Sequence, residues 1–263
     1  MYVQEASVID PRAVVASSAQ VAEDVEIGPF SVIGPEVQIG AGCWIGPHVV
    51  ITGATRLGRN NRIYQFASLG EVPQDLKYRG EQTRLELGDD NTVREGCTMS
   101  RGTVGGGGVT QVGNGNLFMA YVHIAHDCVV GNGTIFANCA SLAGHVTVED
   151  YAVLGGFTGI HQFCRVGAHS ITAIGTVSFK DIPPFITASG SPAEPHGINI
   201  TGLKRRGFTE DRTRRIRQAY KLVYRAGLRV EEALEQIRRL AAGDADLERF
   251  SSFIAQSARG IIR

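Results

Sequence analysis

The stretch IGPFSVIGPEVQIGAGCWIG, residues 27–46, places an isoleucine at every sixth position. The same spacing of large aliphatic side chains extends over residues 9–69 and continues in phase to Met99 after a gap. It restarts one residue out of phase and runs over residues 112–166. A period of six is neither helical nor the simple alternation of a strand. It predicts a short unit repeated along one axis, with each repeat refilling the same core position.

The other positions of the six-residue unit favour a short strand followed by a tight corner. Gly often follows the aliphatic residue, where a missing Cβ permits a tight turn, and the fourth residue after it is small or β-branched, as at Val25, Val37 and Cys43. Three units would close a triangular coil of roughly 18 residues, with each strand pairing with the one above it. This hexapeptide pattern resembles that of left-handed parallel β-helix proteins, and the left-handedness is implied by the resemblance alone.

Two parts are expected along the chain. Residues 1–180 would form the β-helix, with strands fading after Thr172 and with two inserted loops. The first loop, at about 71–84, is polar and keeps the phase; the second, at about 102–110, contains four consecutive glycines and shifts it. Loops on a repeat scaffold gather on one face and usually serve binding. Residues 181–263 would form a linker and a C-terminal helical domain.

The C-terminal part begins with a segment rich in proline, which predicts an irregular linker. Thr209, followed by two acidic residues, is typical of a helix start. Further helices are expected roughly over residues 230–241 and 247–258. Helices at this end would cap the last coil, whose strand edges would otherwise be open.

Composition restricts the class of protein. No apolar stretch is long enough for a transmembrane helix, and the first residues lack a basic and then apolar signal pattern. Four of the five cysteines fall at the fourth position after a repeat aliphatic, so they are expected as small buried side chains in a reducing compartment. We therefore expect a cytoplasmic protein that binds no nucleic acid and has no stable membrane insertion.

Charge is unevenly distributed although the net charge is zero. Residues 181–263 carry 15 Lys and Arg against 10 Asp and Glu, a net charge of +5. Many of the basic residues lie within 204–221. This basic end suggests an acidic partner, with a solvated helical face as the alternative.

Histidines supply the candidate chemistry. The register places His123, His126, His145 and His161 in the middle coils, and His126, His145 and His161 lie within one or two coils of each other in height. A neutral His can act as the base that activates a hydroxyl for acyl transfer, and a carboxylate such as Asp127 can fix its tautomer. Backbone N–H groups at glycine corners could stabilise the oxyanion. Each His alone could instead be a surface residue. A zinc site is not expected, because no matching array of His exists elsewhere.

Five strings in a fixed order make the resemblance specific. The chain resembles UDP-N-acetylglucosamine 3-O-acyltransferases over its whole length, in IYQFASLGEVPQDLKY (63–78), HIAHDCVVGN (123–132), LAGHV (142–146), HQFC (161–164) and NITGLKRRGF (199–208). The resemblance implies transfer of a 3-hydroxyacyl group from acyl carrier protein to the 3-hydroxyl of the GlcNAc of UDP-N-acetylglucosamine, the first step of lipid A biosynthesis. It also implies a homotrimer with active sites between subunits. No cofactor is expected besides the phosphopantetheine of the co-substrate acyl carrier protein.

The resemblance also implies roles for individual residues. His126 would be the general base, Asp127 its carboxylate and Gly144 the backbone oxyanion donor. Ile174 would set the acyl-chain length, because members that accept long chains carry Gly at the position aligned with it. Substrate-binding roles are implied for Gln74, Asp75, Lys77, His123, His145, His161, Gln162, Asn199, Arg205 and Arg206. Of these, Gln162, Asn199 and Arg206 are implied to contact the nucleotide.

Two departures from the family pattern keep the acceptor open. The family often has His where this chain has Ser100 in TMSRGT, and Glu where it has Thr201. The same chemistry on a 3-amino sugar-nucleotide analogue is therefore an alternative. An acetyl-coenzyme A-dependent hexapeptide acetyltransferase and a non-enzymatic binding β-helix are the others.

Overall fold

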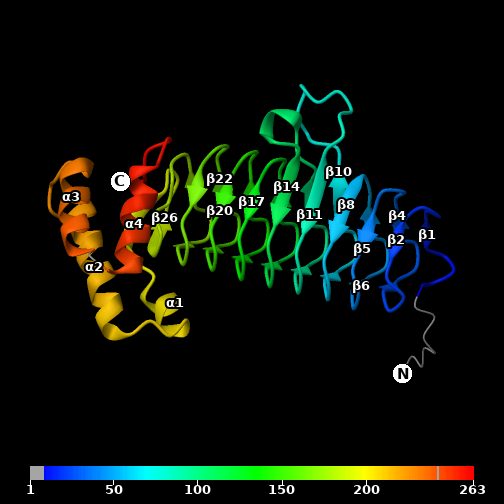
Figure 1. The fold of residues 1–263 in the computed structure, drawn as a ribbon, viewed down its shortest axis with the longest axis horizontal. Helices are drawn as coiled ribbons and strands as arrows, with labels where there is room; N and C mark the ends of the chain where they lie inside the picture. Colours follow the sequence, from blue (N-terminus) through cyan, green and yellow to red (C-terminus); the bar gives the residue numbers. More distant parts are fainter. Residues whose placement is uncertain (1–8, 242) are drawn as a thin grey trace.

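The computed structural model describes residues 9–241 and 243–263, so the segment 1–8, in which no signal pattern was expected, lies outside the described residues. The chain forms a long three-sided β-helix followed by a group of helices (Figure 1). Each turn of the β-helix contributes one short strand to each of three sheets. Strands one turn apart pair in parallel, as Val32 and Ile33 of one turn pair with Val50 and Ile51 of the next.

The described residues form sheets of nine, eight and ten strands. The nine-stranded sheet contains β1 (Val14–Val15), β4 (Val32–Ile33), β7 (Val50–Ile51), β10 (Ser68–Glu71), β13 (Thr98–Ser100), β16 (His123–Ile124), β19 (Ser141–Leu142), β22 (Gly159–Ile160) and β25 (Val177–Ser178). The eight-stranded sheet contains β2 (Gln20–Val21), β5 (Gln38–Ile39), β8 (Ala54–Leu57), β11 (Arg84–Leu87), β14 (Val109–Val112), β17 (Val129–Val130), β20 (Thr147–Val148) and β23 (Arg165–Val166). The ten-stranded sheet contains β3 (Glu26–Ile27), β6 (Trp44–Ile45), β9 (Arg62–Ile63), β12 (Thr92–Val93), β15 (Leu117–Phe118), β18 (Ile135–Phe136), β21 (Val153–Leu154), β24 (Ile171–Thr172), β26 (Ile186–Ser189) and β27 (Glu194–Ile198).

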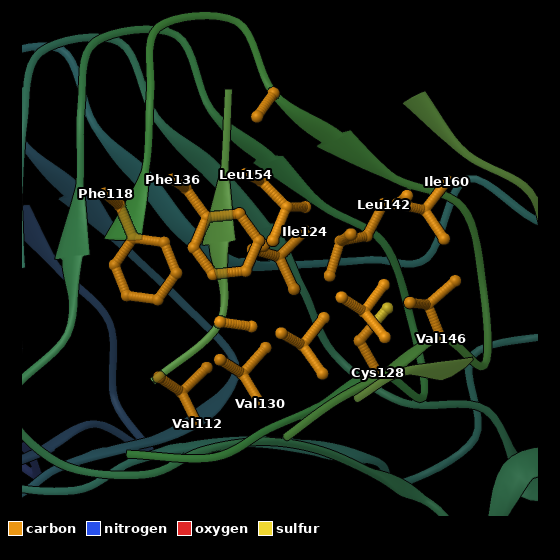
Figure 2. Packing of buried hydrophobic residues seen from close by; sticks show 14 of the residues in the cluster. Val112, Phe118, Ile124, Cys128, Val130, Phe136, Leu142, Val146, Leu154 and Ile160 are labelled. Carbon is orange, nitrogen blue, oxygen red and sulfur yellow. The ribbon is translucent and has the colours of Figure 1, made fainter. Parts of the chain in front are cut away.

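The aliphatic residue of each unit points into the core. In most strands the first residue faces outward and the second is buried, because successive side chains of a strand point to opposite faces. Figure 2 shows Phe118 and Phe136 stacked one coil apart, with ring centroids separated by 5.0 Å. Ile124, Leu142 and Ile160 fill the same position on the next sheet. The six-residue period is therefore the period of the core.

Corner residues have left-handed backbone conformation. The third residue after the aliphatic has φ of 60° at Asp127, 62° at His145 and 64° at Phe163. Asp, Asn and His adopt this region more readily than other non-glycine residues. Since the coils stack in register, corner side chains of successive coils lie over one another. His145 and Phe163, for example, stack at 4.4 Å with an interplanar angle of 9°.

Both inserted loops leave the β-helix at the corner between the nine-stranded and eight-stranded sheets. One joins β10 to β11, and the other joins β13 to β14 and contains the 3-10 helix η1 (Val104–Gly106). Figure 1 shows both on the same side of the molecule. The loops are shorter than expected, because Glu71, Arg84, Val109 and Thr110 lie in strands. β14 pairs with β11 over its whole length, which restores the register after the glycine run.

The proline-rich segment after residue 180 is not the irregular linker that was expected. β26 pairs in parallel with β24 and antiparallel with β27, which forms the edge of the ten-stranded sheet. Pro195 is tolerated in β27 because an edge strand leaves some backbone positions without a ladder partner. Strands therefore continue past Thr172, and the sheet crosses the boundary expected at residue 180.

The C-terminal residues form α1 (Ile200–Arg205), α2 (Glu210–Tyr224), α3 (Val230–Leu240) and α4 (Ala245–Ala255). α2 begins at Thr209 as expected, with Thr209 Oγ1 accepting a hydrogen bond from the N–H of Arg212. α4 begins earlier than expected because Asp244 caps it, and α1 was not predicted. Arg165 of β23 lies 4.2 Å from the ring of Phe253 and joins α4 to the β-helix. Among the described residues, no helix has the length and apolar character that crossing a membrane requires.

Candidate active site

His126 and Asp127 occupy the corner between β16 and β17. Nδ1 of His126 lies 2.7 Å from Oδ2 of Asp127, and the side chains are 15% and 1% exposed. An ionised carboxylate only accepts hydrogen bonds, so Nδ1 carries the proton and donates it to Asp127. Nε2 of His126 is then the basic nitrogen. This is the arrangement in which a carboxylate fixes the tautomer of a general base.

The glycine-rich loop holds the Asp127 carboxylate in place. The N–H of Thr103 donates to Oδ1 at 2.7 Å, and Thr103 Oγ1 donates to Oδ2 at 2.6 Å. The backbone N–H of Asp127 donates to Thr110 Oγ1 at 2.8 Å. A side chain on Gly106 would collide with the carboxylate. Sequence reasoning missed Thr103 and Thr110, although the four glycines indicated a loop that approaches another group closely.

Gly144 lies one coil beyond His126 and leaves space for its ring. A Cβ on Gly144 would lie 2.6 Å from Cε1 of His126 and 2.8 Å from its Nε2. No described residue accepts a hydrogen bond from the Gly144 N–H. The same place in other units is proline, at Pro29, Pro35 and Pro47, so the strand ladder does not need this donor. The N–H is therefore available to an oxyanion beside His126.

His145 and Phe163 extend the site along the same corner. Nε2 of His145 lies 3.7 Å from Oδ2 of Asp127, and its ring meets that of His126 edge-on, with centroids 5.2 Å apart. Phe163 stacks on the other side of His145. The imidazole of His145 is thus held between an aromatic ring and the His126–Asp127 pair.

A shallow groove runs from His123 to His161 along the outer face of the nine-stranded sheet. Its volume is about 380 Å³, and Ala143, Val177 and Phe179 contribute to a largely apolar lining. Nδ1 of His123 is 2.7 Å from Thr98 Oγ1, and burial, with a smaller effect of nearby His126, lowers the pKa of His123. Nη2 of Arg259 donates to Nδ1 of His161 at 2.9 Å.

His126, Asp127 and His145 also place potential metal-ligand atoms within 4.8 Å of one another. However, Oδ2 of Asp127 already accepts hydrogen bonds from His126 and Thr103. A metal ion bound to Oδ2 would have to displace both of these hydrogen bonds. The geometry therefore favours a base and its carboxylate over a metal centre.

The expected site residues lie on three different edges of the β-helix. The edge with His126 also carries Gly144, His145, the loop over residues 72–83 and the corner after β22. That loop and that corner contain Gln74, Asp75, Lys77, His161 and Gln162.

The remaining expected residues lie elsewhere. Arg206, directly after α1, lies at the edge between the eight-stranded and ten-stranded sheets, where its Nη2 donates to the Gly133 carbonyl at 3.4 Å. The side chain of Asn199 caps α1 and also donates to the backbone of His169. Arg205 is exposed. Ile174 is 76% exposed at the third edge, between the ten-stranded and nine-stranded sheets.

Family models match two parts of the chain. The model of bacterial hexapeptide transferases (six repeats) matches residues 110–144, and that of UDP N-acetylglucosamine O-acyltransferase, domain 2, matches residues 181–262. Full-length relatives agree. The acyl-[acyl-carrier-protein]–UDP-N-acetylglucosamine O-acyltransferase of Thiobacillus denitrificans is 58% identical over 255 residues, which are 97% of this chain and 99% of the relative. The enzyme of the same name from Alkalilimnicola ehrlichii is 56% identical over the same shares.

The chain belongs to the UDP-N-acetylglucosamine O-acyltransferase family. It is therefore an acyltransferase, as expected from the five strings.

Solved structures of family members share the whole fold. LpxA from Acinetobacter baumannii superposes with a TM-score of 0.95 at 45% identity, covering 98% of this chain and 100% of that one. The UDP-N-acetylglucosamine O-acyltransferase of Moraxella catarrhalis gives 0.95 at 44% identity, covering 97% and 100%. The left-handed parallel β-helix with C-terminal helices is thus confirmed. Of the two departures from the family pattern, Ser100 is buried in β13 and Thr201 is exposed on α1.

Proposed function

We propose that this chain transfers a 3-hydroxyacyl group from acyl carrier protein to the 3-hydroxyl of the GlcNAc of UDP-N-acetylglucosamine, the first step of lipid A biosynthesis. The observation that carries the proposal is the corner at His126, within a chain of this family. There a buried carboxylate orients a histidine, and a free backbone N–H lies beside its ring. We place the reaction in the cytoplasm, with phosphopantetheine-bound acyl carrier protein as co-substrate and no separate cofactor.

The proposed reaction begins at Nε2 of His126. This nitrogen accepts the proton of the sugar 3-hydroxyl as the oxygen attacks the thioester carbonyl. Negative charge develops on the carbonyl oxygen, and the Gly144 N–H is placed to stabilise it. Asp127 stabilises the imidazolium without taking its proton. When the tetrahedral intermediate collapses, the C–S bond breaks and His126 returns the proton to the leaving pantetheine sulfur.

The groove from His123 to His161 suits the acyl chain. It begins next to the His126 corner, and the outward-facing side chains of Val177 and Phe179 contribute to its apolar lining. Burial of each methylene of the chain there would contribute about 0.8 kcal/mol. His123 and His161, which also line the groove, offer polar contacts for the 3-hydroxyl and the pantetheine.

Substrate binding across three edges calls for more than one copy of the chain. Arg206 and Ile174 lie on edges other than that of His126, so one copy cannot present all three to one substrate. We infer a homotrimer in which edges of neighbouring copies meet, as the resemblance implied. A closed cyclic assembly would also cover exposed apolar corner residues such as Phe157, which is 62% exposed.

The test is direct assay of the purified protein. It is incubated with 3-hydroxyacyl carrier protein and UDP-N-acetylglucosamine, and mass spectrometry follows the acylated nucleotide. Parallel reactions replace the carrier protein with acetyl-coenzyme A or the acceptor with its 3-amino analogue. O-acylated UDP-N-acetylglucosamine as the main product supports the proposal. A faster reaction with acetyl-coenzyme A would instead support an acetyltransferase, and a faster reaction with the 3-amino analogue would instead support acylation of an amine.

A further inference from the structure

Tyr151 and His169 stack on each other at the edge between the eight-stranded and ten-stranded sheets. They are corner residues of successive coils, with φ of 61° and 58°. Their ring centroids are 5.0 Å apart, with an interplanar angle of 28°. On its far side His169 lies 5.8 Å from the ring of Phe185 and 5.0 Å from that of Phe208. The stack therefore runs from the exposed edge into the base of the helical part.

The short helix α1 is fastened to this stack at both ends. At its start, Nδ2 of Asn199 donates to the His169 carbonyl at 2.9 Å, while Oδ1 accepts from the N–H of Gly202 at 3.0 Å. At its end, the guanidinium carbon of Arg206 lies 4.2 Å from the centroid of the Tyr151 ring. Nη2 of Arg206 donates to the Gly133 carbonyl at 3.4 Å.

These contacts form a closed cycle of Tyr151, His169, Asn199, α1 and Arg206. α1 has six residues, too few for a helix to be stable alone in water. Its position must therefore come from its attachments. The Arg206 guanidinium has no carboxylate partner among the described residues, and the ring and one carbonyl orient it.

We propose that Tyr151 and His169 are positioning residues, which hold α1 against the β-helix so that Arg206 keeps the orientation in which it receives the nucleotide. The inference rests on the proposed function and on the nucleotide contact that the family resemblance implies for Arg206. Neither ring needs to touch the substrate. The Tyr151 hydroxyl has no hydrogen-bond partner among the described residues, so the ring face makes the contact and phenylalanine should replace tyrosine there.

The chain contains a matched control. Phe30 is also a left-handed corner residue; it stacks on His48 at 5.1 Å, and the guanidinium carbon of Arg12 lies 5.2 Å from its ring centroid. The same triad of aromatic, histidine and arginine thus occurs near the N-terminal end of the β-helix, far from α1. Phe30→Ala and His48→Ala remove the same types of contact as Tyr151→Ala and His169→Ala.

Two measurements on the full chain test the inference. Hydrogen–deuterium exchange reports the protection of residues 200–206, and steady-state kinetics separate the KM for UDP-N-acetylglucosamine from the KM for acyl carrier protein and from kcat. Tyr151→Ala and His169→Ala should speed exchange in 200–206. They should also raise the nucleotide KM about tenfold, as expected from loss of one cation–π contact or its support. Tyr151→Phe should match the wild type, and both control variants should leave exchange in 200–206 unchanged.

Each opposite result overturns a defined part of the inference. Unchanged exchange in Tyr151→Ala would show that the stack does not hold α1. Faster exchange with an unchanged nucleotide KM would show that α1 does not position Arg206. A wild-type protein that acylates no UDP-N-acetylglucosamine would instead refute the proposed function, and exchange would still decide the attachment of α1. Calorimetric titration with UDP-N-acetylglucosamine would then replace KM as the measure of nucleotide binding.

Discussion

Nδ1 of His126 donates a 2.7 Å hydrogen bond to Oδ2 of Asp127, the next residue in the chain. The left-handed φ of 60° at Asp127 is part of the corner turn, so the β-helix itself brings the two side chains together. The carboxylate is almost completely buried and also accepts hydrogen bonds from Thr103. The His126 ring is therefore oriented before any substrate arrives.

We predict that Gly106→Ala lowers kcat on the order of 10²-fold, because the new Cβ would displace the carboxylate that orients His126. Gly105→Ala is the matched control: it changes the neighbouring residue of the same 3-10 helix, where a Cβ meets nothing within 4 Å. Steady-state kinetics and thermal unfolding should be measured for both. Equal kcat in the two variants would show that the loop does not orient Asp127.

Acyl carrier protein is expected to dock on the basic helix α2, and the variants that test this must leave the ion pairs of that helix intact. Arg212 and Arg215 pair with Asp246 and Asp244, so reversing their charge would disturb helix packing. Arg217 and Lys221 are exposed, and no described acidic residue pairs with them. We predict that the KM for acyl carrier protein rises with ionic strength, and rises again in Arg217→Glu/Lys221→Glu, because salt and charge reversal both weaken attraction to an acidic partner. If neither change appears, this face of α2 is a solvated surface that does not dock acyl carrier protein.

Ile174 should limit the length of the acyl chain. It is 76% exposed in the single chain, at an edge available to a neighbouring copy. We predict a preference for medium-length 3-hydroxyacyl chains, with Ile174→Gly shifting selectivity toward longer chains by roughly 5- to 200-fold. Competition between medium-chain and long-chain acyl carrier proteins measures the shift. The same preference in wild type and variant would assign chain length to another residue.

His169 should make stability fall in acid. Burial, together with nearby arginines, lowers its pKa from 6.5 to about 4. Between these values the unfolded chain takes up a proton that the folded chain does not, so the free energy of unfolding decreases as pH falls through this window. We predict that His169→Gln loses part of this pH dependence. Denaturant unfolding at pH 4 to 6.5 gives the slopes; an unchanged slope in His169→Gln would refute the assignment.

The sequence predicted the β-helix because every six-residue unit places a residue at the same core position. A unit that departs from the pattern therefore does not change the prediction for its neighbours. The sequence did not predict the continuation through β26 and β27, where prolines hide the alternation and pairing with β24 decides the structure. Nor did it predict Asn61, Asn91 and Asn116 at core positions. These buried amides bond to one another across successive coils, and only the stacked register supplies their partners.

The candidate site was predictable where its residues are adjacent in sequence, as His126 and Asp127 are. Thr103 could not be inferred, because its contact with Asp127 depends on the path of the inserted loop. The role of Asn199 was expected to be nucleotide contact, and its side chain instead caps α1 and bonds to His169. A nucleotide role for Asn199 stays a prediction. To contact a nucleotide, its side chain would have to give up its hydrogen bonds at the start of α1.

The central claim, that His126 is the general base, is tested most directly by the single-turnover rate of His126→Ala with 3-hydroxyacyl carrier protein and UDP-N-acetylglucosamine. The variant should fold and assemble as the wild type does, because His126 lies outside the core. We predict a rate lower on the order of 10²–10⁴-fold, the usual contribution of a general base, with nucleotide affinity nearly unchanged. A correctly folded His126→Ala protein that transfers the acyl group within a few-fold of the wild-type rate would contradict the claim.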